Sequence, residues 1–305
     1  MRVGFVGIGR LGGRLAARVV AAGFDVVVHD RDEARAAPLL AGGAGWAASP
    51  ADAARGADAV VTCLPSPEAS TEVVALEGGV LDALAPGATW IEMSTTDRHE
   101  LVRTARVASE RGIATLEAPV TGGVHLAATG ELTVIVGGEK AVAEAHMPLL
   151  RAMGRRVFHV GPLGRATELK LITNMLAFVH LVADGEALML ARRAGLDLAQ
   201  AWEVIAASSG TSFVHETEGQ VILNGSYDIG FTLDLALKDL GLALELGAET
   251  GVPLALAEET GRALEEARGR YGGSAWSPTV VKLLEDAVGV DLRAPGFPAT
   301  LEPSD

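Results

Sequence analysis

The chain has 305 residues, of which 49% are hydrophobic and 21% charged, and its formal net charge is −14. This length is typical of two domains, each with enough material for a buried core. The acidic balance argues against nucleic acid or an anionic membrane surface as a partner, and no apolar run reaches the ~18 residues of a membrane-spanning helix. The single cysteine, Cys63, excludes an internal disulfide and is typical of a reducing compartment. Because the chain enters a strand directly, without a signal sequence, we expect a cytoplasmic protein.

The first thirty residues have the pattern strand, glycine turn, helix, strand. An apolar run, Val3–Val6, precedes the turn, and apolar residues then recur at helical spacing up to Gly23. A second apolar run, Val26–Val28, is followed by Asp30, 18 residues after the last glycine of the turn. The turn itself reads Gly7, Ile8, Gly9, Arg10, Leu11, Gly12.

This pattern predicts a dinucleotide site. The first glycine permits a tight turn, the second lets the backbone approach a pyrophosphate, and the third lets helix and strand pack closely. The N–H groups of the first helical turn then face the anion. Asp30 is placed to accept from both ribose hydroxyls of NAD and to repel a 2′-phosphate, which favours NAD. Arg31 beside it would instead pair with that phosphate, so NADP stays the alternative. Whether Arg10 approaches the pyrophosphate or lies in solvent is left open.

Short apolar runs alternate with amphipathic segments as far as residue 163. Further strands are expected at Ala59–Cys63, Thr89–Met93, Ile113–Leu116, Leu132–Val136 and Val157–Val160. Helices are expected between them at Ser49–Arg55, Arg98–Glu110 and Glu139–Met153. Such alternation predicts an α/β Rossmann-like domain with a mainly parallel sheet.

From residue 164 the pattern is helical. Helices are expected at Arg165–Ala194, Leu198–Ser208, Leu233–Thr250, Pro253–Arg268 and Thr279–Val288. The first would span about 45 Å, and its stretch Leu171–Ala183 carries no charged residue, which indicates burial against another helix or subunit. We therefore expect three parts: a dinucleotide-binding domain at 1–163, an all-α substrate and dimerisation domain at 164–293, and an irregular tail at 294–305. A homodimer or homotetramer is expected.

Ligands of parallel α/β sheets bind beyond the carboxyl ends of the strands. Thr121, Gly122 and Gly123 follow one such strand and offer O–H and N–H donors to a carboxylate, although alone they would be an ordinary turn. Lys170 immediately precedes the uncharged stretch, with Asn174 one turn later on the same face. A lysine capping an apolar helix end is the simpler interpretation, but a lysine at a domain boundary can act as a general acid or base.

Together these segments resemble the β-hydroxyacid dehydrogenase family over about residues 2–287. The resemblance rests on motifs in the family's order: the glycine turn, with Leu11 where methionine is usual; Glu117–Gly123, with Thr121 for the usual serine; Gly161–Gly164 followed by Lys170–Asn174; and Phe231 with Lys238-Asp239. Leu64-Pro65 and Ser94-Thr95 also match the family.

The resemblance implies hydride transfer between a nicotinamide cofactor and a short β-hydroxyacid or its semialdehyde. Lys170 would be the general acid/base, Asn174 would orient the substrate, and Thr121, Gly122 and Gly123 would hold its carboxylate. The cofactor would contact Leu64, Pro65 and Thr95, with Phe231 and Lys238 closing over it from the helical domain. The family commonly has glycine and alanine soon after Gly123, whereas this chain has His125 and Leu126, which puts the rest of the substrate in doubt.

Two other functions fit the fold. An imine reductase would share the architecture but generally has another residue in place of Lys170. A non-catalytic cofactor-binding sensor would be expected to lose the lysine or the substrate loop, and both are present. No metal site is expected, because the seven histidines show no ligand spacing.

Overall fold

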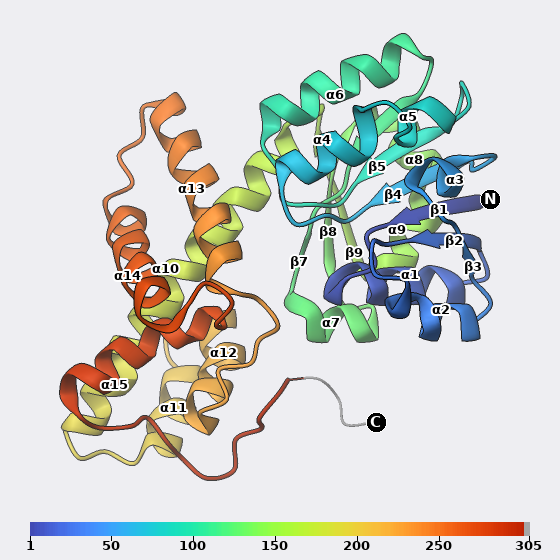
Figure 1. The fold of residues 1–305 in the computed structure, drawn as a ribbon. Coiled ribbons are helices and arrows are strands. Elements are labelled where there is room, and N and C mark those ends of the chain that lie inside the picture. The colour runs from blue at the N-terminus through green and yellow to red at the C-terminus, as the bar shows by residue number, and fades with distance from the viewer. Residues whose placement is uncertain (302–305) are drawn as a thin grey trace. The chain divides into compact units, whose positions relative to one another are not determined.

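The structure is a computed structural model that describes residues 1–301. The chain divides into two compact units, one ending at Lys170 and one starting at Leu171. This division falls inside a long helix, seven residues beyond the boundary expected from the sequence. Figure 1 shows the first unit as a sheet covered by helices and the second as helices alone.

The first unit is built on a nine-stranded sheet of order β3-β2-β1-β4-β5-β6-β8-β7, with β9 paired to β8. The pairs from β3 to β6 are all parallel, whereas β8 runs antiparallel to β6 and β7. The mainly parallel Rossmann-like sheet is therefore confirmed. The strands are β1 Arg2–Val6, β2 Asp25–His29, β3 Gly45–Trp46, β4 Ala59–Thr62, β5 Thr89–Glu92, β6 Ala114–Glu117, β7 Val120–Thr121, β8 Thr133–Gly138 and β9 Arg156–Gly161.

Two apolar cores lie on the two faces of this sheet because successive side chains of a strand point to opposite sides. Val61 and Ile91 pack in one core with α1 and α9, and Val60 and Trp90 pack in the other with α3 and α6. The helices are α1 Arg10–Ala21, η1 Glu33–Ala36, α2 Ala37–Ala41, α3 Pro50–Ala54, α4 Pro67–Ala75, α5 Val80–Ala83, α6 Arg98–Glu110, α7 Gly123–Thr129, α8 Lys140–Ala145 and α9 Met147–Met153.

The second unit begins within α10, Arg165–Arg193, and every named element in its described part is a helix. Its core gathers Leu181, Leu188, Ile222, Leu240 and Leu264 from four helices, all nearly inaccessible to solvent. An all-α second unit is therefore confirmed. Its further helices are α11 Leu198–Ala206, α12 Phe213–Asn224, α13 Leu233–Thr250, α14 Ala255–Tyr271, η2 Ser277–Val281 and α15 Lys282–Val288.

Among the helices that differ from expectation, two have a clear cause in the sequence. Glu139–Met153 forms two helices rather than one, with the break at His146 just before Pro148, whose ring cannot continue a helix interior. The helix α12 was not expected, because its centre is polar and contains Gly219.

One described helix, α10, is long and apolar enough to cross a membrane by length and composition. The sequence-based expectation was that no segment would meet this test. A single such helix is weak evidence for a membrane span, since a core helix of a soluble protein passes the same test.

From Ala294 to Leu301 the chain is irregular but bonded to the second unit. Ala294 N–H donates to Leu223 O, and Asn224 Nδ2 donates to Phe297 O at 2.8 Å. The ring of Phe297 packs edge-on against Trp202. The last part of the expected tail, residues 302–305, lies outside the described residues.

Candidate active site

The glycine turn has the geometry that its residues predict. Gly7 adopts φ +90°, and a Cβ there would lie 2.3 Å from Cys63 O. A Cβ on Gly12 would lie 2.0 Å from Gly7 O. No side chain fits at either position without moving the backbone, so α1 can approach β1 and β4 only with glycine here. The turn leads into α1 at Arg10, which is exposed, while Ile8 is buried and Leu11 packs partly against the core.

Asp30 lies directly after β2 and bonds to the turn. Its Oδ2 accepts from Ile8 N–H at 2.9 Å and its Oδ1 from Asp32 N–H at 3.0 Å. The carboxylate is thus fixed beside the glycine turn, where an adenosine ribose would lie. Arg31 is exposed.

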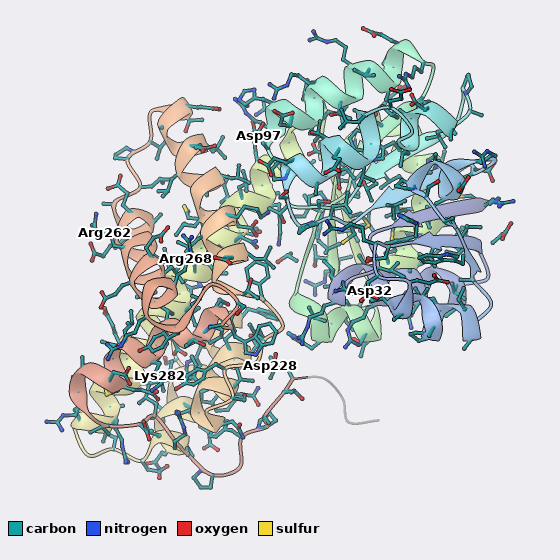
Figure 2. The ribbon with its side chains drawn as sticks, in the orientation of Figure 1. Asp32, Asp97, Asp228, Arg262, Arg268 and Lys282 are labelled. Carbon is teal, nitrogen blue, oxygen red and sulfur yellow. The ribbon has the colours of Figure 1, made fainter. Side chains whose placement is uncertain are left out.

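A second arginine near the turn was not anticipated. Nη1 of Arg35, in η1, lies 3.3 Å from the point that a Cβ on Gly9 would occupy. Its Nε pairs with Asp32 Oδ2 at 3.2 Å, and Asp32, which is labelled in Figure 2, also caps η1. A guanidinium here can approach a cofactor phosphate. Its only trace in the sequence is a cation five residues after Asp30.

The loops after β4 and β5 are tied together by one buried network. Ser94 Oγ accepts from Leu64 N–H at 2.7 Å, and Ser94 N–H donates to Glu92 Oε1 at 2.8 Å. Burial raises the pKa of Glu92, although hydrogen bonds from Ser70 and Ser94 oppose the shift. This network fixes the loops that carry two sequence-predicted residues, the exposed Pro65 and the partly buried Thr95.

The predicted substrate loop follows β6 through the short strand β7. Gly122 and Gly123 have φ +126° and +80°, which only glycine adopts readily. A Cβ on Gly122 would lie 3.0 Å from Leu126 Cδ1, and one on Gly123 would lie 3.0 Å from His125 Cε1. The two residues that depart from the family pattern therefore pack directly on the two glycines.

Lys170 lies in the second turn of α10 and is buried, with 9% of its surface exposed. Asn174 follows one turn later on the same helix. Its Nδ2 donates to Asp239 Oδ2 at 2.6 Å, and Lys238 Nζ lies 2.7 Å from Asp239 Oδ1. Asp239 is itself buried, so it fixes both the amide and the ammonium group. Phe231, just before α13, stacks on Phe178.

The structure thus places the glycine turn, Asp30, Leu64, Pro65, Thr95, the substrate loop and Lys170 in the first unit. It places Asn174, Phe231 and Lys238 in the second. Within residues 1–301, no group of three or more His, Cys, Asp or Glu side chains is arranged to hold a metal ion.

Two family models match the chain. Residues 2–161 match the NAD binding domain of 6-phosphogluconate dehydrogenase, and residues 164–284 match a domain described as NAD-binding of NADP-dependent 3-hydroxyisobutyrate dehydrogenase. The two matches together span both units, so the chain is an oxidoreductase that uses a nicotinamide cofactor.

Characterised relatives match over most of their length. The chain is 34% identical to 2-(hydroxymethyl)glutarate dehydrogenase of Eubacterium barkeri, over 96% of this chain and 97% of that protein. It is 36% identical to the NAD-dependent L-serine dehydrogenase of Pseudomonas aeruginosa, over 80% of this chain and 84% of that protein.

Solved structures agree with these matches. The crystal structure of 3-hydroxyisobutyrate dehydrogenase from Salmonella typhimurium superposes with a TM-score of 0.86 at 31% identity, over 93% of this chain and 99% of that one. An imine reductase from Myxococcus stipitatus, in complex with NADP⁺, superposes with a TM-score of 0.61 at 19% identity, over 93% and 99% of the two chains, which shows a shared fold alone. The chain therefore belongs to the β-hydroxyacid dehydrogenase family.

Proposed function

We propose that this protein oxidises a short β-hydroxyacid to its semialdehyde, or catalyses the reverse reduction, with Lys170 as general acid/base. The observation that carries the proposal is the buried Lys170 in the same unit as the glycine turn and the substrate loop. A lysine that is largely withdrawn from water, in the unit that holds the dinucleotide turn, is suited to act as a general acid or base.

The chain's own residues supply binding and proton transfer. Thr121 Oγ1 and the N–H groups of Gly122 and Gly123 donate to the substrate carboxylate, and Asn174 orients the hydroxyl. Lys170 accepts the hydroxyl proton during oxidation and returns it during reduction. When bound, the nicotinamide supplies the hydride acceptor or donor.

The relatives suggest the substrate class. 2-(Hydroxymethyl)glutarate, L-serine and 3-hydroxyisobutyrate each carry a primary alcohol on the carbon next to the one that bears the carboxylate, and they differ in the third substituent of that central carbon. We propose that this chain acts on the same 2-substituted 3-hydroxypropanoate unit. His125 and Leu126, which pack on the substrate loop, then face that substituent.

The test is Lys170→Ala assayed by nicotinamide absorbance with a panel of short hydroxyacids. We expect kcat to fall by roughly 10²-fold or more while the Kd of the cofactor stays within about twofold. Lys140→Ala is the matched control, because the Lys140 side chain is 76% exposed on α8. Turnover of the Lys170 variant near the wild-type rate would overturn the mechanism.

We propose NAD as the cofactor, because Asp30 holds a carboxylate beside the glycine turn and its charge would repel a 2′-phosphate. Arg31 and Arg35 argue for NADP instead, because a guanidinium pairs with a 2′-phosphate. We expect a lower KM for NAD than for NADP, and a reduced difference in Asp30→Asn, because the amide removes the charge. Asp25→Asn, at the other end of β2, is the control. A preference of the native protein for NADP would reverse the assignment.

We further propose that the protein is cytoplasmic and self-associates. The lone thiol, Cys63, supports a reducing compartment, and burial raises its pKa to about 12, which makes it unreactive. The small carboxylate substrate is the partner that the site requires, and the charge of −14 continues to argue against nucleic acid and anionic membranes.

A further inference from the structure

Glu117 is a buried acid at the junction between the sheet and the substrate loop. It is the last residue of β6, four residues before Thr121, and only 1% of its surface is exposed. Removing a carboxylate from water is unfavourable unless hydrogen-bond donors replace the lost hydration. The groups that donate hydrogen bonds to the Glu117 carboxylate therefore indicate the role of this side chain.

Its carboxylate accepts hydrogen bonds from the first turn of α10. Oε1 accepts from Ala166 N–H at 3.0 Å, and Oε2 accepts from Thr167 N–H at 2.9 Å and from Thr167 Oγ1 at 2.5 Å. The first N–H groups of a helix have no partner within the helix, and the positive end of the helix dipole favours an anion there. Glu117 thus fixes this helix end to the sheet.

The sheet leaves room for this carboxylate only because its neighbour has no side chain. Glu117 lies opposite Gly137 in the antiparallel pair of β6 and β8, and a Cβ on Gly137 would lie 2.2 Å from Glu117 Oε1. Burial raises the pKa of Glu117, and the hydrogen bonds from Thr167 and Ala166 oppose this rise.

Lys170 follows Ala166 by four residues and Thr167 by three. Residues at these spacings lie on the same face of a helix, one turn apart. The turn held by Glu117 is therefore the turn directly before the lysine, and the same glutamate begins the segment that carries the substrate loop.

We propose that Glu117 is the positioning residue of the reaction: it sets the distance between Lys170 and the carboxylate-binding loop by anchoring the first turn of α10 to the end of β6. This inference rests on the proposed function, because it assigns Glu117 an effect exerted through Lys170. A change at Glu117 should therefore lower kcat and not weaken cofactor binding, because the glycine turn follows β1 whereas Glu117 ends β6. A displacement of about 1 Å at a reacting group can lower a rate about 10²-fold.

The same turn has a second anchor, which provides the control. Glu168 pairs with Arg98 of α6 at 2.6 Å and with Arg165 at 2.8 Å. Arg98→Lys weakens this ion pair and leaves unchanged the Glu117 carboxylate that joins α10 to β6. It therefore reports the effect of loosening α10 in general.

The test is a double-mutant cycle of Glu117→Gln and Lys170→Ala. Glutamine keeps the shape but replaces one acceptor by a donor that faces N–H groups. We expect Glu117→Gln to lower kcat about 10- to 100-fold, with the Kd of NAD within about twofold, and to change the residual rate of Lys170→Ala by less than about twofold. Arg98→Lys should lower kcat by less than about threefold. Equal factors of loss on both backgrounds would mean a purely structural role and would overturn the inference.

A second pair of variants serves if Glu117→Gln does not fold. Thr167→Val removes one donor to Glu117 and keeps both backbone donors, and we expect a kcat loss of about threefold or more that Thr167→Ser restores. No loss in Thr167→Val, or no restoration by serine, would contradict the inference. If the Glu117 and Thr167 variants do not show the expected losses while Lys170→Ala is inactive, only the positioning role is refuted. If Lys170→Ala is active, the proposed function itself is refuted.

Discussion

Glu218 of α12 is a partly buried acid whose titration bears on the stability of the second unit. Burial and the nearby charge of Asp184 raise its pKa to about 8. Asp184 is already bonded to His215, whose Nδ1 lies 2.5 Å from Asp184 Oδ1. The pKa of His215 is raised overall, since the bonds to Asp184 and Trp202 outweigh the opposing effect of burial.

Both shifts make the folded state bind more protons than the unfolded state. For Glu218 this holds between an unfolded pKa of 4.5 and a folded value of about 8, so the free energy of unfolding falls as pH rises through this range. The stabilisation from His215 is complete below its unfolded pKa of 6.5 and is lost as pH rises through its folded value. We expect Tm to fall steadily from pH 5 to pH 8.5.

Glu218→Gln separates the two contributions, because it removes one titration and keeps the other. We expect a shallower fall of Tm with pH and a variant more stable than the native protein at pH 8.5. Glu203→Gln, an exposed acid on α11, is the control and should leave the slope unchanged. The same slope in Glu218→Gln as in the native protein would show that this carboxyl does not titrate in the range.

Two glycines of the α13–α14 hairpin are expected to change stability in opposite directions when each is replaced by alanine. A Cβ on Gly247 would lie 2.5 Å from Leu254 Cδ1 and 3.2 Å from Val252 O, so alanine there must push the connection away from α13. Gly269 of α14 is exposed, and nothing lies within 4 Å of a Cβ. We expect Gly247→Ala to destabilise by about 1–3 kcal/mol and Gly269→Ala to stabilise by about 0.5–1 kcal/mol. Urea unfolding of both variants measures this, and stabilisation by Gly247→Ala would contradict the packing.

The helices that the sequence placed well are those with strong end residues. Arg98–Glu110 and Leu233–Thr250 have the expected bounds because Asp97, marked in Figure 2, and Thr232 accept hydrogen bonds from the third residue of each helix. Short elements were missed. The two-residue strand β7 and the helix α7 have no periodicity to detect, and they form because Gly122 and Gly123 adopt positive φ.

In the whole molecule, the sequence indicates the segments of the candidate site but not the contacts that hold those segments in place. The glycine turn, Asp30 and Lys170 are visible because each requires a particular residue type at a particular spacing. Glu117, Arg35 and Asp239 act on segments far away in the chain, and a long-range partner leaves no local pattern. In the sequence Glu117 is only the first residue of a motif, which indicates nothing of its hydrogen bonds to α10.

The long helix α10 carries an apolar stripe that argues for self-association. Leu169, Leu176, Ala183 and Leu190 recur every seven residues and are exposed, with Ile172 between the first two. A seven-residue apolar repeat suits packing against another helix, and a second copy offers the same stripe across a twofold axis. Because the stripe residues carry no charge, a second copy of this acidic protein can cover them without presenting a basic patch.

Light scattering after size exclusion tests this stripe. We expect the native protein to have at least twice the mass of one chain, and Leu176→Glu with Leu190→Glu to shift it toward the monomer, because each copy would then bury unpaired charges in the interface. Leu256→Glu, at an equally exposed leucine on α14, is the control and should keep the native mass. A native protein that is monomeric at about 100 µM, or a double variant of unchanged mass, would show that the stripe serves another purpose. Because the stripe belongs to the helix that also carries Lys170 and Asn174, loss of the oligomer is further expected to lower kcat more than it raises the Kd of NAD.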